Sequence, residues 1–188
     1  NGPVYIQMLI GNEGIKVNEV AARIGGAYED EFIPAITGVD ILQLQFELAA
    51  RGKVKNSVLK KYQFPSAAYG SAILFFTKPG VIKANGDMDI VKNITGVING
   101  KYILKPGRRI GFRKNSTERA GYVALQSESR IKLEVLKKKV YSLLEVIDIN
   151  GDKVESNTAE VTPLGKPWLV DRLIEWDLID VSRVLKKY

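Results

Sequence analysis

The feature that most constrains the fold is a series of short β-type segments between residues 67 and 127, which glycines separate. The segments are SAILFFTK, GVIKANG, ITGVING, KYILKPG, RRIGF and AGYVALQS. Runs of β-branched and aromatic residues between glycine turns are typical of antiparallel strands. The sequence therefore predicts a small antiparallel β-meander or barrel over this stretch.

A helix is predicted directly after these segments, over SESRIKLEVLKKKVYSLLEV. Its apolar residues recur on one side at helical spacing. They are Ile131, Val135, Leu136, Val140, Leu143 and Leu144. A strand over EVIDI and a turn at Asn150-Gly151-Asp152 follow. The sequence thus predicts an α+β fold class in which one helix packs on an antiparallel β region.

The first part of the chain has a different pattern. Residues 4–10 and 15–20 are β-rich and flank a turn signal at 11–14, which predicts a hairpin. Residues 23–38 predict a loop, because Gly25, Gly26, Pro34 and Gly38 interrupt the stretch. Residues 39–51 predict a mostly buried helix, with Asp40 in its first turn and Gly52 just past its end.

These patterns divide the chain into three segments: 1–52, 53–150 and 151–188. The second opens with a basic linker over 53–66, and the third contains an amphipathic helix candidate from Pro167 onward. We expect Trp168 and Trp176 of that helix to pack on this domain or on a partner. Because Asn1 lies only a few residues before a strand, we expect the chain to be part of a longer polypeptide.

The composition excludes several kinds of chemistry. The chain has no cysteine and no histidine, which excludes disulfides, thiolate sites, zinc-hydrolase sites and triads with a histidine base. Any chemistry must use carboxylates, amides, lysine, arginine or backbone N–H groups, and any metal should be a hard, oxygen-binding one. No run of about 18 apolar residues and no signal peptide is present, so we expect a cytoplasmic protein without a membrane span.

The net charge of +7 raises a nucleic-acid hypothesis. A basic β-barrel module could stack bases on aromatic residues of the β region. The candidates are Tyr62, Phe64, Tyr69, Phe75, Phe76 and Phe112. The lysine clusters at 53–61 and 132–139 alternate with core-type residues, which favours solvated helix faces over a nucleic-acid site. A structural or assembly domain is a further alternative.

The predicted hairpin carries the residues with the most chemical content. Side chains two apart share a face, so Val17 and Glu19 share one face, and Gln7 lies on the facing strand. Gln7 and Glu19 would offer neighbouring oxygen ligands for magnesium if the register brings them together. Arg23 can hold a phosphate or carboxylate. Gly25 and Gly26 let backbone approach an anion. A surface ion pair between Glu19 and Arg23 explains the spacing about equally well.

The run NEVAARIGGAYEDEFIPAITGVDIL resembles the end of the nucleotide-binding region of ATP-grasp enzymes. That superfamily includes biotin carboxylase, the large subunit of carbamoyl phosphate synthetase and other carboxylate–amine ligases. The resemblance is specific over residues 16–42 and extends more weakly to residue 150. In the family, two antiparallel strands carry metal ligands, and the second continues as Glu-x-Asn-x-Arg. The motif at 37–40, TGVD, resembles the turn that opens the family's next helix.

The resemblance implies roles for individual residues. Gln7 and Glu19 match the ligands of Mg²⁺ (or Mn²⁺), and Arg23 matches the arginine that stabilises the transferring phosphoryl group. Ala21 stands at the asparagine position, so one metal ligand is missing there. Asn18 is expected to face away from the ligands. For Glu29, Asp30 and Glu31, contact with an amine substrate and a solvated acidic loop both stay open.

The resemblance also implies an activity. The whole enzyme would use MgATP to activate a carboxylate (or bicarbonate) as an acyl phosphate and transfer it to an amine nucleophile. The phosphate-binding lysines and the adenine-binding strand would lie in an upstream remainder of the polypeptide, so we expect this chain alone to be inactive. An exposed strand edge would allow a homo-oligomer. We do not expect nucleic-acid binding.

Overall fold

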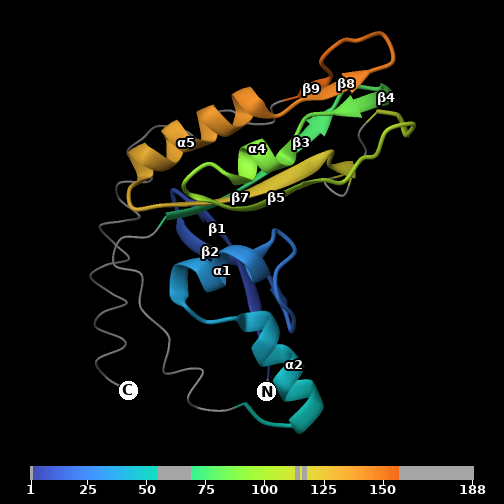
Figure 1. Cartoon of the computed structure of the whole chain (residues 1–188). Helices are drawn as coiled ribbons and strands as arrows, with labels where there is room; N and C mark the ends of the chain where they lie inside the picture. Colours follow the sequence, from blue (N-terminus) through green and yellow to red (C-terminus); the bar gives the residue numbers. More distant parts are fainter. Residues whose placement is uncertain (1, 55–68, 113–114, 116–117, 157–188) are drawn as a thin grey trace. The chain divides into compact units, whose positions relative to one another are not determined.

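The largest sheet has β7 (Gly121–Ser127) near its centre, in the order β5-β7-β3-β9, and every neighbouring pair is antiparallel. The other strands are β5 (Val97–Tyr102), β3 (Tyr69–Thr77) and β9 (Glu155–Ser156). The computed structural model describes residues 2–54, 69–112, 115 and 118–156 (Figure 1). Residues up to Ser156 form one compact unit.

One face of this sheet carries the core. Ile73 and Phe75 of β3 and Val123 and Leu125 of β7 are at most 2% exposed, because they lie beneath the helix α5 (Arg130–Leu143). That helix contributes its own apolar stripe: Leu133 and Val140 are buried, and Leu144 follows at its C-cap. The predicted packing of one helix on an antiparallel region is therefore confirmed. The predicted apolar side is only partly right, because Ile131, Val135 and Leu143 are 79%, 63% and 39% exposed, while Leu133 is buried.

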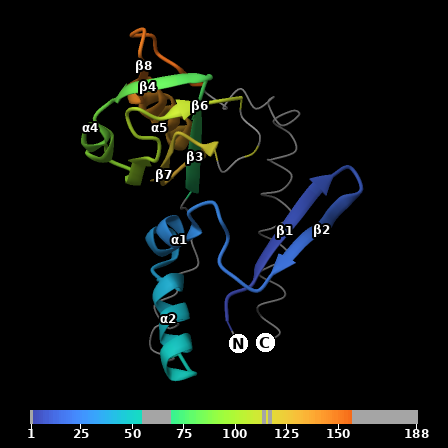
Figure 2. The ribbon, with the colours of Figure 1, turned by 90° about the vertical axis from the view of Figure 1, so that its right-hand side faces the viewer.

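A second sheet has the order β6-β4-β8 (Figure 2). Its strands are β6 (Arg109–Ile110), β4 (Gly80–Asn85) and β8 (Val146–Asp148). The short helix α4 (Met88–Lys92), which the sequence pattern did not indicate, follows β4 and packs on β5. In both sheets the neighbours are distant in sequence, so the strands interleave rather than follow one another as a meander.

The opposite face of the large sheet receives α1 (Glu29–Thr37) (Figure 1). This helix shows that the prediction of a loop over residues 23–38 is wrong for residues 29–37. Phe32 and Ile36 lie against Gly70 of β3, where a Cβ would be only 2.5 Å from Cδ1 of Ile36. Helix α1 thus forms because its apolar residues have a sheet surface to cover, even with Pro34 inside it.

The helix α2 (Ile41–Arg51) confirms the predicted helix over 39–51. The Asp40 carboxylate accepts the backbone N–H of Gln43 at 2.8 Å, and Gly52 closes the other end in a left-handed conformation. The expectation that this helix is mostly buried is wrong: none of its residues is buried, and Phe46 is 66% exposed.

The predicted hairpin is present as β1 (Tyr5–Gly11) and β2 (Gly14–Ala21). Within the described residues the two strands pair only with each other (Figure 2). The basic linker lies mostly outside the described residues, as do Tyr62, Phe64 and the helix candidate from Pro167 onward. The domain boundaries at 52 and 150 stay predictions.

No single helix in the described ranges is long and apolar enough to cross a membrane; α1 and α2 reach that threshold only when counted together across a bend of 106°.

Candidate functional site

The hairpin register places Gln7 directly opposite Glu19. Directly opposed residues of an antiparallel pair have Cβ atoms about 5 Å apart, so both side chains leave the same face of the hairpin. Both are exposed. The structure therefore brings together the two residues that were predicted as oxygen ligands.

A bulge follows this pair and changes which residues share its face. Gln7 pairs with Glu19, but the next residue, Met8, pairs with Val17, so Asn18 is the extra residue of β2. Consecutive positions of β1 point to opposite faces. The expectation that Val17 and Glu19 share a face is therefore wrong.

The bulge also corrects the expectation for Asn18. Its Nδ2 donates a hydrogen bond to Oε1 of Gln7 at 2.5 Å, so its side chain reaches the Gln7–Glu19 face instead of facing away. Because this bond uses the Gln7 amide oxygen as acceptor, it orients that oxygen toward the bulge. Asn18 is a candidate site residue that alternation alone misses.

The Arg23 side chain lies beside Glu19. Its Nη2 donates to Oε1 of Glu19 at 3.1 Å, and its Nη1 donates to the carbonyl oxygen of Ile24 at 3.1 Å. The guanidinium also lies 5.2 Å from the centroid of the Tyr5 ring, within cation–π range. Glu19 and Arg23 are about half exposed, so the ion pair contributes less than about 1 kcal/mol to stability. The ion pair does, however, hold the Arg23 guanidinium next to the Gln7–Glu19 pair.

The glycine pair follows Arg23. A Cβ on Gly25 would lie 2.2 Å from Oε1 of Glu29, whereas a Cβ on Gly26 would meet nothing within 4 Å. Oε2 of Glu29 accepts the backbone N–H of Ala27 at 2.6 Å. The anion that approaches Gly25 in this structure is thus the chain's own Glu29 carboxylate, and Gly26 has open space beside it.

The three acidic residues of the α1 N-terminus have different environments. Glu29 binds the turn before the helix, Asp30 is exposed, and Glu31 turns toward the sheet. Oε1 of Glu31 accepts the hydroxyl of Tyr122 at 2.5 Å and the Asn99 amide at 3.1 Å. A uniformly solvated acidic loop does not describe this segment.

Aromatic contacts complete the junction between α1 and the sheet. The rings of Tyr28 and Tyr122 stack with centroids 3.5 Å apart and planes 11° apart, and the Arg119 guanidinium lies 5.0 Å from the Tyr28 ring. Burial raises the pKa of the Tyr122 phenol far above its usual value, and the neighbouring Glu31 raises it further. Tyr122 therefore stays protonated and serves as the donor to Glu31.

The residues of the hairpin fit part of a magnesium site by their donor chemistry. A carboxylate and an amide oxygen are ligand types that magnesium accepts, and its remaining positions are usually filled by phosphate oxygens and water. Within the described part of the chain, the hairpin included, no group of three or more His, Cys, Asp or Glu side chains lies together to hold a metal. Ala21 pairs with Tyr5 and offers no ligand.

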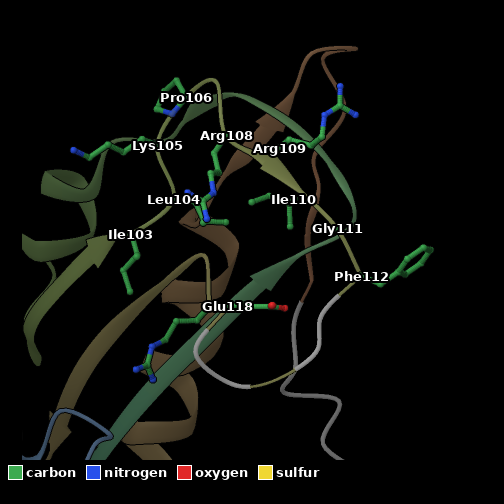
Figure 3. A pocket seen from close by; sticks show the side chains of 11 residues that line it. Ile103, Leu104, Lys105, Pro106, Arg108, Arg109, Ile110, Gly111, Phe112 and Glu118 are labelled. Atoms are coloured by element: carbon green, nitrogen blue, oxygen red, sulfur yellow. The ribbon is translucent and has the colours of Figure 1, made fainter.

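A separate cavity of about 1010 Å³ lies beside β6, lined by Leu104, Arg108, Ile110 and neighbouring residues (Figure 3). In this view Arg108 points toward Leu104, while Lys105 and Arg109 point away. These three cations therefore do not converge on a common point in this view.

Among the residues that the structure describes, the aromatic candidates of the β region do not form a base-stacking platform. Phe75 and Phe76 are 1% and 7% exposed, so both belong to the core. Phe112 is 85% exposed and Tyr69 is 36% exposed, but they belong to separate segments. The buried pair removes the main aromatic candidates for nucleic-acid binding.

Comparison with known proteins gives matches among solved structures. No family model matches the chain, and no curated protein matches it in sequence. An L-amino acid ligase from Bacillus licheniformis superposes with a TM-score of 0.64 at 20% identity, over 78% of this chain and 38% of that one. Phosphoribosylglycinamide synthetase from Anaerococcus prevotii superposes with a TM-score of 0.65 at 13% identity, over 77% of this chain and 36% of that one.

A third match is the biotin carboxylase domain of 2-oxoglutarate carboxylase from Hydrogenobacter thermophilus, in complex with MgADP and bicarbonate. Its TM-score is 0.55 at 16% identity, over 80% of this chain and 32% of that one. These neighbours are ATP-grasp enzymes, so the chain shares the fold of part of an ATP-grasp enzyme. It spans little more than a third of the length of the first two.

Proposed function

We propose that this chain forms one wall of the active site of an ATP-dependent carboxylate–amine ligase. The whole enzyme would activate a carboxylate (or bicarbonate) as an acyl phosphate and pass the acyl group to an amine. The observation that carries the proposal is the register of the hairpin, which sets Gln7 opposite Glu19 with Arg23 bound to Glu19. A likeness in fold to ATP-grasp enzymes supports it.

Each residue has a role that its contacts support. Gln7 and Glu19 would hold Mg²⁺, and Asn18 would keep the Gln7 amide oxygen oriented. The metal, when bound with ATP, offsets charge on the phosphates. Arg23 binds Glu19 through one oxygen only, so its planar donor fork can also reach a phosphoryl or carboxylate oxygen as negative charge develops.

Gly26 would let the backbone approach that anion closely, whereas Gly25 is already covered by the Glu29 carboxylate. Gly26 has open space and no positive φ, so an added methyl group there costs little in the fold itself. Gly26→Ala should therefore leave the thermal midpoint nearly unchanged but lower turnover, because the methyl group would occupy space that the substrate anion needs. Unchanged turnover would remove Gly26 from the proposed site.

The main test uses the full-length protein and measures ADP formation from MgATP, with bicarbonate or single L-amino acids as the carboxylate. Glu19→Ala should lower turnover by at least about 100-fold, as loss of a transition-state electrostatic contact does. Arg23→Lys should fall between wild type and Arg23→Ala, because lysine keeps the charge but loses the planar fork.

Glu13→Gln is the matched control for Glu19. Glu13 is an exposed acidic residue of the same hairpin, and it pairs with Lys16 at the turn. Its loss should leave turnover unchanged. Normal ADP formation by Glu19→Ala in an otherwise active enzyme would exclude the metal role.

A further inference from the structure

Three unusual features coincide where α1 begins. Tyr28 has φ of 68°, and it is the only non-glycine residue with a positive φ in the described part of the chain. Oε2 of Glu31 is buried without a hydrogen-bond partner. The Tyr28 ring stacks closely on Tyr122. Strained backbone and an unpartnered buried oxygen persist only where the surroundings fix them, and they concentrate at functional sites.

The contacts that fix this point come from two neighbouring strands. Tyr122 of β7 and Asn99 of β5 both donate to Oε1 of Glu31, and Arg119, just before β7, lies over Tyr28. The same Asn99 amide lies 3.4 Å from the Tyr122 hydroxyl. We call these five residues the clasp: Tyr28, Glu31, Asn99, Arg119 and Tyr122.

The clasp is connected to the glycine turn through short covalent and polar links. Tyr28 is two residues from Gly26. Glu29, between Tyr28 and Glu31 in the sequence, accepts the Ala27 N–H and lies against Gly25. The turn is therefore fixed to the start of α1, and the start of α1 is fixed to the sheet.

Packing alone does not require this arrangement. Phe32 and Ile36 already seat α1 on Gly70. Replacing a buried charged group and its partner with apolar residues of similar shape is often neutral or stabilising, whereas removing one partner is costly. A partly buried Glu31 with a buried Oε2 thus adds little stability, but its hydrogen bonds define one position of the helix along the strands.

From these contacts we propose that Tyr122 and Glu31 are positioning residues that set the place of the Gly25–Gly26 turn in the active site. This inference rests on the proposed function, since the turn would contact the substrate anion. The clasp is then the means by which the β region contributes to a site whose ligands lie on the hairpin. Neither residue is assigned a contact with the reacting atoms.

The test compares three variants of the full-length protein. Tyr122→Phe removes only the hydroxyl and keeps the stacked ring. The double variant Glu31→Leu/Tyr122→Phe replaces the whole polar pair with apolar groups and should retain the thermal midpoint. Asp30→Asn is the matched control, because it removes a charge from an exposed neighbouring position of α1.

Two measurements are made on each variant. In hydrogen exchange, the hydrogen-bonded amides of Ala27, Glu31 and Phe32 should exchange about tenfold faster in Tyr122→Phe and in the double variant, while β7 amides keep their rates. In steady-state assays of ADP formation, kcat should fall by about 10-fold to 100-fold while KM for MgATP changes little, because a displaced positioning group chiefly costs the chemical step. Asp30→Asn should match wild type in both.

The outcomes separate this inference from the proposed function. Unchanged exchange of the turn in Tyr122→Phe would overturn the clasp as a positioning device. A double variant with wild-type kcat would show that the clasp does not position the turn for catalysis, which also overturns the inference. If wild type forms no ADP with any carboxylate, the proposed function fails by itself, and the exchange comparison still decides whether the clasp holds the turn.

Discussion

At the scale of single residues, the glycine pair after Arg23 shows two different uses of a missing side chain. Gly25 is needed by the fold, because the Glu29 carboxylate lies where its Cβ would be. Gly26 has no such neighbour. Gly25 therefore serves the internal contact between the turn and α1, and in the proposed function Gly26 is the position that a ligand would approach.

This difference predicts a non-additive pair of substitutions. Gly25→Ala should displace the Glu29 carboxylate from the Ala27 N–H and cost about 1 kcal/mol of unfolding free energy, the usual contribution of one hydrogen bond. Glu29→Ala should cost about as much, through the same bond. The double variant should lose no more than either single one, because the bond can be lost only once.

Urea denaturation of the single and double variants measures this coupling. Asp30→Ala combined with Gly25→Ala is the control pair, and its two effects should add. Additive losses for Gly25 and Glu29 would contradict the contact between them.

The residues at the site also show what the sequence can and cannot specify. The sequence left the pairing of Gln7 with Glu19 conditional on the register: the turn alone would continue the ladder from Met8–Val17 to Gln7–Asn18, and the bulge shifts the partner of Gln7 to Glu19. The bulge at Asn18 was not predictable, because an extra residue in one strand leaves no mark in local composition. Asn18 and Val17 were placed on the wrong faces for that reason alone.

At the scale of elements, α1 and α2 form for different reasons: α2 has local end signals in its sequence, whereas α1 depends on tertiary contacts. The sequence predicted α2 because Asp40 and Gly52 mark its two ends. It missed α1, because two glycines, Pro34 and Gly38 outweigh its short apolar pattern. The partners that stabilise α1, Gly70 and Tyr122, are distant in sequence, and no local pattern shows them.

The dependence of α2 on its end signal is testable. Asp40→Ala removes the side-chain acceptor of the Gln43 N–H and should destabilise the helix by about 1 kcal/mol, the typical cost of a lost N-cap. Because no residue of α2 is buried, the effect should stay local. Hydrogen exchange should show faster amides at residues 43–46, with β7 unchanged.

Asp40→Asn provides the control, since asparagine also caps helices well. It should restore most of the protection. Equal loss in Asp40→Ala and Asp40→Asn would show that charge at this position, and not the capping hydrogen bond, stabilises α2.

At the scale of the whole molecule, β7 joins the parts that matter for the site. Its core-side residues pack with α5, and Tyr122, on the other face, holds Glu31 of α1. The strand begins at Gly121, which pairs with Tyr102 of β5 and Phe75 of β3. A change at this residue should therefore act on the core and on the clasp together.

Gly121 has no space for a side chain. A Cβ there would lie 2.3 Å from Cζ of Phe75 and 2.4 Å from the backbone oxygen of Lys101. The backbone oxygen cannot move without disturbing the β5–β7 ladder, and Phe75 is 1% exposed. Gly121→Ala should therefore lower the free energy of unfolding by about 3 kcal/mol, at the upper end of overpacking costs.

Urea denaturation followed by circular dichroism measures this loss, with Gly111→Ala as the control. Gly111 has open space and no positive φ, so its substitution should change the unfolding free energy by less than about 0.5 kcal/mol. If Gly121→Ala were as stable as Gly111→Ala, β7 would have to lie farther from Phe75 than the structure shows. The close packing of β3, β5 and β7 described above would then be wrong. In the full-length enzyme the same variant should also lower ADP formation, because Tyr122 follows Gly121 directly and shifts with it.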